Sequence, residues 1–279
     1  MKSTVWGHRK RSLRGFTVSF RKQKISLKSA DQVDKMQASA EVLASVFLEA
    51  RKLVRPGVTT GELDEAIETH IRQAGCIPSF KGYHGFPGSA CISVNEEVVH
   101  GIPGPRVLNE GDIVGIDIGV IKDGWHSDSA ETLPVGTVSA EAARLLKTTE
   151  ACLNLAIEAI APGERLSVIG SAVEDHARGA GYSVVETLVG HGIGRELHED
   201  PQVPNFRCYT MPDPVLEAGM VLAIEPMINC GTKRVITARD QWTILTQDRR
   251  LSAHFEHTVA ITEDGPRVLT RRESVLAGL

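Results

Sequence analysis

Two segments of this chain match one another without gaps at a separation of 106 residues, and this internal repeat constrains the fold more than any other feature. Residues 56–75 and 162–181 both begin with Pro-Gly and end with Gly, but such residues also mark helix ends in general. The matching residues inside the two segments are therefore stronger evidence for a repeat than the matching Pro-Gly and Gly residues at their ends. We interpret the repeat as a duplicated helix–helix–strand unit, which predicts a pseudo-symmetric α+β domain with a site that draws ligands from both halves. The internal matches are Ala66, Glu68, His70, Arg72, Ala74 and Gly75 against Ala172, Glu174, His176, Arg178, Ala180 and Gly181.

The apolar periodicity predicts four helices, two of which lie in the repeated segments. Strand-like apolar runs follow the second helix at 90–94 and 112–120, and the chain beyond the fourth helix reads as strands and loops. The helices are expected from Asp31 to a stop at Pro56-Gly57, from a Thr59/Glu62 capping pair to Gly75, from Ser139 toward Pro162-Gly163, and from Ser167 to Gly179.

Composition excludes several classes of protein. The chain has 279 residues, of which 42% are hydrophobic, and no apolar run is long enough to cross a bilayer. The first residues lack the apolar core and cleavage site of a secretory signal. The five cysteines are odd in number and widely spread, without a Cys-x-x-Cys pair. This pattern predicts a reducing, cytoplasmic location and neither a disulfide framework nor a thiolate zinc site.

Charge is distributed unevenly along the chain. Residues 1–30 contain nine lysines and arginines and no acid, which leaves 22 basic against 35 acidic residues in the remainder. A basic arm on an acidic body suggests a separate role for the arm, such as contact with ribosomal RNA phosphates. A solvated, flexible tail and an organelle transit peptide are the alternatives. We therefore divide the chain into an arm, 1–30, and a catalytic domain, 31–279.

The segment IDIGVIKDGWHSD, residues 116–128, predicts a β-hairpin around its Asp-Gly pair. In that register Gly119 faces Asp128, and Asp117 lies two residues further along its strand on the same face. The two carboxylates are therefore diagonal neighbours, with backbones roughly 7–8 Å apart and no side chain at Gly119 between them. Two like charges so placed repel unless a cation or a proton lies between them. Two exposed strand residues are the alternative, against which the apolar neighbours argue.

Three later segments, GHGIGRELHEDP, AIEPM and FEHTV, contribute His191, Glu225 and Glu256. A lone buried glutamate is costly and usually paired, and a lone histidine is more often a core or surface residue than a ligand. Together with Asp117 and Asp128, however, these oxygen ligands and one imidazole suit a pair of divalent metals such as Mn, Fe, Co or Zn. The glycines of GHGIG miss the dinucleotide-binding spacing, and HED lacks the second histidine of a zinc helix.

Five segments together resemble type I methionine aminopeptidases: YHGFP, VVHGIP, IDIGVIKDGWHSD, GHGIGRELHEDP with IEPM, and FEHT. They occur in the order and at the approximate spacing of that family, over about residues 31–272. The resemblance implies a pita-bread fold, in which pseudo-two-fold repeated halves surround a curved antiparallel sheet. It also implies an enzyme that removes the initiator methionine from nascent proteins when the second residue is small. Gly119 stands where many members have Thr, and Leu197 replaces a common Phe, so the surroundings of the site are expected to differ.

The resemblance implies a set of metal ligands. Asp128 and Glu256 would bridge two divalent ions, Asp117 would hold one of them, and His191 and Glu225 would hold the other. Two metal ions held in this way would share a water molecule and lower its pKa, which makes hydroxide available near neutral pH.

The resemblance also implies catalytic and substrate-binding residues. Glu225 would act as general base or proton shuttle, His198 would stabilise the oxyanion, and His100 would contact the scissile amide nitrogen. Apolar, polarizable side chains suit a thioether, although core packing is the alternative for each of them. The methionine pocket would be lined by Tyr83, Phe86, Cys91 and Trp242, with Phe80 nearby and His84 supporting it.

Two other readings compete with this one. X-Pro aminopeptidases and prolidases of the same fold generally carry an extra N-terminal domain, which an arm of thirty residues cannot supply. A non-catalytic binding protein on this fold would have lost its ligands, whereas all five are present here. We therefore expect a monomeric enzyme whose partners are nascent polypeptide N-termini, with no membrane contact.

Overall fold

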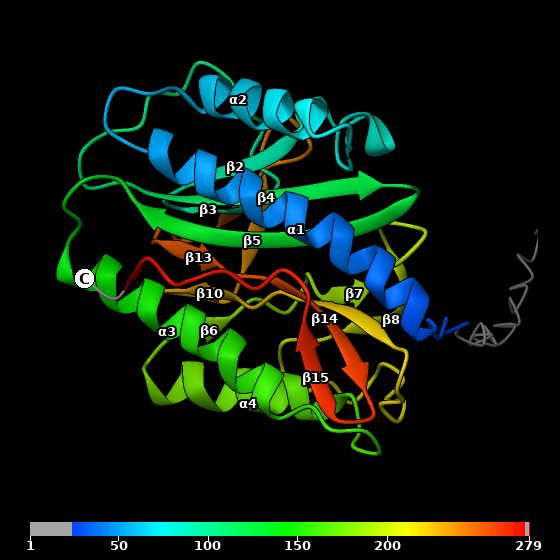
Figure 1. Ribbon diagram of the computed structural model, residues 1–279. Coiled ribbons are helices and arrows are strands. Elements are labelled where there is room, and N and C mark those ends of the chain that lie inside the picture. The colour runs from blue at the N-terminus through cyan, green and yellow to red at the C-terminus, as the bar shows by residue number, and fades with distance from the viewer. Residues whose placement is uncertain (1–23, 277–278) are drawn as a thin grey trace, which may run out of the picture.

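The computed structural model describes residues 24–276 and residue 279. The helices are α1 (Ala30–Leu53), α2 (Thr60–Gln73), α3 (Ala140–Glu158) and α4 (Ser167–Gly179), with a short 3-10 helix η1 (Tyr83–Gly85). The α-helices lie in two pairs, α1 with α2 and α3 with α4, on opposite sides of a set of antiparallel strands (Figure 1). The strands are β1 (Ile77–Pro78), β2 (Ala90–Val94), β3 (Glu97–Val99), β4 (Ile113–Lys122), β5 (Trp125–Pro134), β6 (Ser183–Val184), β7 (Gly190–Gly192), β8 (Glu199–Val203), β9 (Val221–Ile224), β10 (Met227–Asn229), β11 (Val235–Thr237), β12 (Ile244–Thr246), β13 (Ser252–His254), β14 (His257–Thr262) and β15 (Gly265–Val268).

The helices begin where the sequence places capping residues. Thr59 and Glu62 form the expected capping box of α2: the Thr59 hydroxyl accepts from the Glu62 backbone N–H at 3.1 Å, and the Glu62 carboxylate accepts from the Thr59 N–H at 2.8 Å. Ser139 caps α3 as expected. Helix α1 begins one residue before Asp31, because Ser29 forms a second capping box with Gln32.

The internal repeat is present in the backbone hydrogen bonds. Gly57 N–H donates to the Leu108 carbonyl at 2.8 Å, and Gly163 N–H, 106 residues later, donates to the Leu216 carbonyl at the same distance. The repeated glycines that end the two segments both have positive φ. Strands β1 and β6 then begin 106 residues apart. The predicted pseudo-symmetric α+β arrangement is therefore confirmed, with one helix pair packed in each half.

The β4–β5 hairpin has the predicted register. Lys122 pairs with Trp125 and Gly119 pairs with Asp128, and both turn residues have positive φ, as the tight turn requires. Strand β4 also pairs with β1 and β2, while β14 pairs with β9 and β15 in a five-stranded sheet.

The two halves meet where β5 passes the connection between β13 and β14. There the Glu256 N–H donates to the Ala130 carbonyl at 2.9 Å, and the Asp128 N–H donates to the Thr258 hydroxyl at 3.0 Å. One hydrophobic cluster lies under α1 and α2 and another under α3 and α4, so each half has a core of its own. Residues such as Asp128 and Glu256, where the two halves meet, therefore lie between the two hydrophobic cores.

The described part of the basic arm, residues 24–29, lies against the body. The Lys28 side chain is buried, its backbone N–H donates to the Gly219 carbonyl at 2.7 Å, and its ammonium contacts a Glu199 carboxylate oxygen at 2.6 Å. Residues 1–23, which hold the rest of the predicted arm, lie outside the described residues. Within the described residues, no helix has the length and apolar character to span a membrane. All five cysteines carry free thiols.

Candidate metal centre and substrate pocket

The β4–β5 hairpin brings two aspartates together. Asp117 lies on β4 and Asp128 on β5, and the register places Gly119 opposite Asp128. Among the described residues, Asp117 Oδ1 and Asp128 Oδ1 are buried and have no hydrogen-bond partner. Because buried carboxylate oxygens are almost always satisfied, these atoms are available to a cation.

The second half contributes His191 from β7, Glu225 from the end of β9, and Glu256 from the connection between β13 and β14. His191 Nε2 lies 3.7 Å from Glu225 Oε1 and 4.0 Å from Asp128 Oδ2. Ligand atoms of Asp128, His191 and Glu256 all lie within 4.8 Å of one another, a separation that a shared metal ion can span. The halves therefore both supply the cluster, as the repeat predicts.

The His191 ring is oriented for metal binding. Its Nδ1 lies 2.9 Å from the Gly192 carbonyl oxygen, which can only accept, so Nδ1 carries the proton. The lone pair of Nε2 then faces the carboxylates. Burial and the nearby His198 lower the pKa of His191 to about 3, so the imidazole is neutral and can act as a ligand.

The negative charges of the clustered carboxylates repel one another. Burial raises the pKa of Asp128 to about 7, and burial together with the Asp128 charge raises those of Asp117 and Glu225 well above their ordinary values. Glu256 is affected in the same way, and its Oε1 has no partner among the described residues. Three of these four acids have a buried oxygen without a hydrogen-bond partner in the described part of the chain, and the cluster fits divalent cations, which would supply the missing charge and contacts.

The cluster forms one end of a cavity of about 250 Å³. All the residues that the sequence analysis assigned to ligands, catalysis or the methionine pocket line this cavity. The Phe86 and Trp242 rings meet edge to face, with centroids 5.2 Å apart. The lining residues are Phe80, Tyr83, His84, Phe86, Cys91, His100, Asp117, Asp128, His191, Leu197, His198, Glu225, Trp242 and Glu256.

The two expected catalytic histidines flank the ligands. The His198 ring lies 4.3 Å from that of His191, and its Nδ1 is 2.7 Å from the Tyr83 hydroxyl. Burial lowers the pKa of both His198 and His100, which favours their neutral forms. His100 has φ 59, a conformation unusual for a non-glycine residue and often found at functional sites.

Sequence reasoning missed one histidine. His254 is buried on β13, its Nε2 lies 3.8 Å from Glu225 Oε2, and burial lowers its pKa to about 3. Its position two residues before Glu256 is the only sequence signal for it, and that signal is weak.

Gly119, the first of the two departures noted above, fits its neighbours closely. A Cβ atom there would lie 2.6 Å from Ser79 Cβ and 2.8 Å from Phe80 Cε1. The Phe80 segment thus occupies space that a larger residue would need. Leu197, the second departure, forms part of the cavity wall.

The fold and this site define a metallopeptidase, and residues 34–263 match the model of metallopeptidase family M24. Methionine aminopeptidase 1 of Bacillus subtilis (strain 168) is 49% identical over 249 residues, which are 88% of this chain and 99% of that protein. The methionine aminopeptidase of Clostridium perfringens (strain 13 / Type A) is 48% identical over 88% of this chain and 98% of its own length. The chain belongs to the methionine aminopeptidases.

Solved structures of methionine aminopeptidases resemble this chain over most of its length. The methionine aminopeptidase of Thermotoga maritima has a TM-score of 0.86 and 40% identity, over 89% of this chain and all of that one. That of Rickettsia prowazekii has the same TM-score at 38% identity and the same coverage. A prolidase from Pyrococcus furiosus, at a TM-score of 0.72 and 22% identity, shares the fold only. The expected pita-bread fold is therefore confirmed.

Proposed function

We propose that this enzyme hydrolyses the N-terminal methionine from polypeptides whose second residue is small, at a centre of two divalent metal ions. One observation carries the proposal: three buried carboxylate oxygens of the cluster lack hydrogen-bond partners among the described residues, and the cluster forms one end of a cavity whose walls include aromatic side chains and the Cys91 thiol. The ligand chemistry suits Mn, Fe, Co or Zn.

The five ligands divide into two sets. Asp128 and Glu256 would contribute to holding both ions, Asp117 would hold one ion, and His191 with Glu225 would hold the other. Asp128 and Glu256 lie at the junction of the two halves, and their ligand atoms fall in one group with that of His191. When bound, the ions supply Lewis-acid polarisation of the scissile carbonyl and lower the pKa of water.

Side chains beside the ligands supply the remaining chemistry. Glu225, whose buried carboxylate has a raised pKa, takes and returns a proton as the water attacks. His198 donates to the oxyanion that develops on the substrate carbonyl, while the Tyr83 hydroxyl holds its Nδ1. His100 contacts the scissile amide nitrogen. His254 Nε2 lies 3.8 Å from Glu225 Oε2, next to this carboxylate.

Substrate selection follows from the cavity. Tyr83, Phe86, Cys91 and Trp242 offer a polarizable apolar surface that suits a methionine thioether, and Phe80 extends it. A bound metal ion would take the substrate's free α-amine, which would restrict cleavage to chain termini. Large second residues are rejected by steric crowding, which discriminates more sharply than hydrophobic attraction.

The partners of the enzyme are nascent polypeptide N-termini, and we propose that it acts as a cytoplasmic monomer. Free thiols at all five cysteines support a reducing compartment. The basic arm contacts ribosomal RNA in this proposal, because its charge is segregated from an acidic body.

The test compares Met-Ala-Ser, Met-Lys-Ser, acetyl-Met-Ala-Ser and Ala-Pro-Phe with added Mn²⁺ or Co²⁺. Only Met-Ala-Ser should be cleaved, because the acetylated control lacks the free amine and the other two violate the size or side-chain requirement. Faster cleavage of Ala-Pro-Phe, or cleavage of the acetylated peptide, would contradict the proposal.

A further inference from the structure

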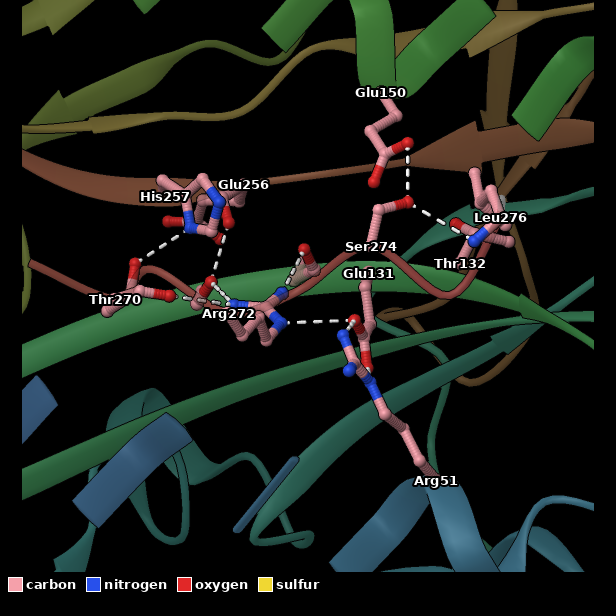
Figure 2. Close-up of polar contacts among 12 residues, drawn as sticks. Arg51, Glu131, Thr132, Glu150, Glu256, His257, Thr270, Arg272, Ser274 and Leu276 are labelled. Carbon is pink, nitrogen blue, oxygen red and sulfur yellow. Dashed lines mark hydrogen bonds and ion pairs between the residues drawn. The ribbon is translucent and has the colours of Figure 1, made fainter. Parts of the chain in front are cut away.

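A buried arginine lies behind the proposed metal centre. After β15 the chain turns back along β5, and Figure 2 shows Arg272 reaching into this strand from the C-terminal segment. Its Nε donates to a Glu131 carboxylate oxygen at 3.0 Å and its Nη2 donates to the Ala130 carbonyl at 2.9 Å. Its Nη1 donates to the Ser129 hydroxyl at 2.7 Å. The side chain is only 6% exposed.

These contacts lead directly to two of the proposed ligands. Ser129 follows Asp128 in the chain, and its hydroxyl donates to the Glu256 carbonyl at 2.5 Å. The Glu256 N–H donates to the Ala130 carbonyl, which also accepts from Arg272. The segment that begins at Asp128 is therefore hydrogen-bonded to the backbone of Glu256, and Arg272 donates to both connecting groups, the Ser129 hydroxyl and the Ala130 carbonyl.

The arrangement requires an arginine at this position. A planar guanidinium donates in several directions at once, whereas a lysine ammonium is a single point charge. The Arg272 guanidinium carbon also lies 3.9 Å from the Phe47 ring centroid, which covers one of its faces. Glu131 balances the buried charge and is itself held by Arg51, whose Nε donates to Oε1 at 2.8 Å. Arg51 donates to Glu131 and has no hydrogen bond to Ser129 or Ala130 among the described residues.

We propose that Arg272 is a positioning residue that fixes the Asp128 and Glu256 carboxylates at the separation needed to hold the metal ions. The inference rests on the proposed ligand set. Its physical basis is that groups outside the ligand shell determine the orientation of ligands, and their loss typically lowers metal affinity by about 10–100-fold. A structural role alone would change the stability of the protein without changing metal affinity in the folded state.

The experiment uses R272K, S129A and the control R51M in the full chain. Mn²⁺ affinity is measured by calorimetric titration of protein freed of metal by a chelator, together with kcat and KM for Met-Ala-Ser and the melting temperature. Arg51→Met removes a guanidinium from the same glutamate but leaves the links to Ser129 and Ala130. R272K and S129A should weaken Mn²⁺ binding by about 10–100-fold and lower kcat more than KM. R51M should lower the melting temperature and keep the wild-type affinity.

Wild-type affinity in folded S129A and R272K would overturn the inference, as would an equal loss of affinity in R51M. If R272K does not fold, the Mn²⁺ affinity of S129A tests the inference, because this variant removes the hydroxyl that connects Arg272 to the Glu256 carbonyl. Failure of the proposed function has a different signature: the wild-type protein itself would then neither bind Mn²⁺ nor cleave Met-Ala-Ser.

Discussion

Replacing Gly119 with alanine should disturb the methionine pocket from behind. The added Cβ would lie 2.6 Å from Ser79 Cβ and 2.8 Å from Phe80 Cε1, whereas carbon atoms pack at about 3.5–4.0 Å. Both neighbours must therefore move by roughly 1 Å. They cannot move freely, because the Ser79 N–H donates to the Gly119 carbonyl at 2.9 Å and holds this segment to β4.

The expected cost follows from this overpacking. Forcing an extra carbon into a packed interior typically costs about 1–3 kcal/mol, and the rigid attachment of Ser79 places G119A in the upper half of that range. Phe80 lines the substrate cavity, so displacement of its ring should also raise KM for Met-Ala-Ser. Phe80 is 7% exposed, so the open space next to its ring is the substrate cavity itself.

Gly115 provides a matched control on the same strand. A Cβ there would lie 3.5 Å from Thr132 Oγ1 and 3.6 Å from the Ser93 carbonyl oxygen, which are ordinary contacts. Urea unfolding should show G119A destabilised by about 2–3 kcal/mol and G115A within about 0.5 kcal/mol of wild type. Peptide kinetics should show a raised KM in G119A alone. Equal stability of the two variants with unchanged KM would refute the packing argument.

His198→Ala should lower kcat by about 10²–10³-fold with little change in KM, and a change confined to KM would assign the residue to substrate binding alone. Deletion of residues 1–23 should preserve tripeptide cleavage and weaken ribosome co-sedimentation, which should fall steeply with salt in the full chain; salt-independent binding would contradict the RNA contact. Lys28→Met should lower the free energy of unfolding in urea by about 3 kcal/mol, because it leaves the largely buried carboxylate of Glu199 without its cation. A loss below about 1 kcal/mol would show that this ion pair does not stabilise the fold. Burial opposes ionisation of Glu131, but the attraction of Arg272 and hydrogen bonds from Arg51 outweigh it and lower its pKa. The stabilising contribution of Glu131 is therefore complete above its unfolded pKa of about 4.3 and is lost as the pH falls through the lower folded value. The stability difference between wild type and E131Q should accordingly be larger at pH 7 than at pH 3, and a pH-independent difference would show that the charge does not matter.

Local signals predicted much of the fold. The Asp-Gly turn determines the register of its hairpin, so the pairing of Gly119 with Asp128 follows from sequence alone. Capping residues such as Thr59 determine where helices begin. The internal repeat predicted that the halves would share a site, and His191 and Asp128 do come from opposite halves.

Contacts between distant segments could not be predicted in the same way. Lys28 reads as one more charge of a basic arm, yet it pairs with Glu199 across 171 positions. Arg272 follows the last strand in a polar stretch, and only the folded chain places it behind β5. His254 lies near Glu225 because β13 pairs with β10, a pairing that no local pattern specifies. Burial and long-range pairing depend on how whole elements pack, which periodicity does not encode.

The metal content of the protein tests the central claim most directly. Metal-free wild-type protein, D128N and E256Q should be dialysed against Mn²⁺ and analysed for bound metal by mass spectrometry. We predict two ions per chain in the wild type, and at most one weakly held ion in either variant, because each substituted carboxylate is assigned to both ions. Both variants replace a negatively charged carboxylate by a neutral amide of nearly the same size, so the fold should persist. Two tightly held ions in D128N or E256Q, or fewer than two in the saturated wild type, would contradict the proposed centre.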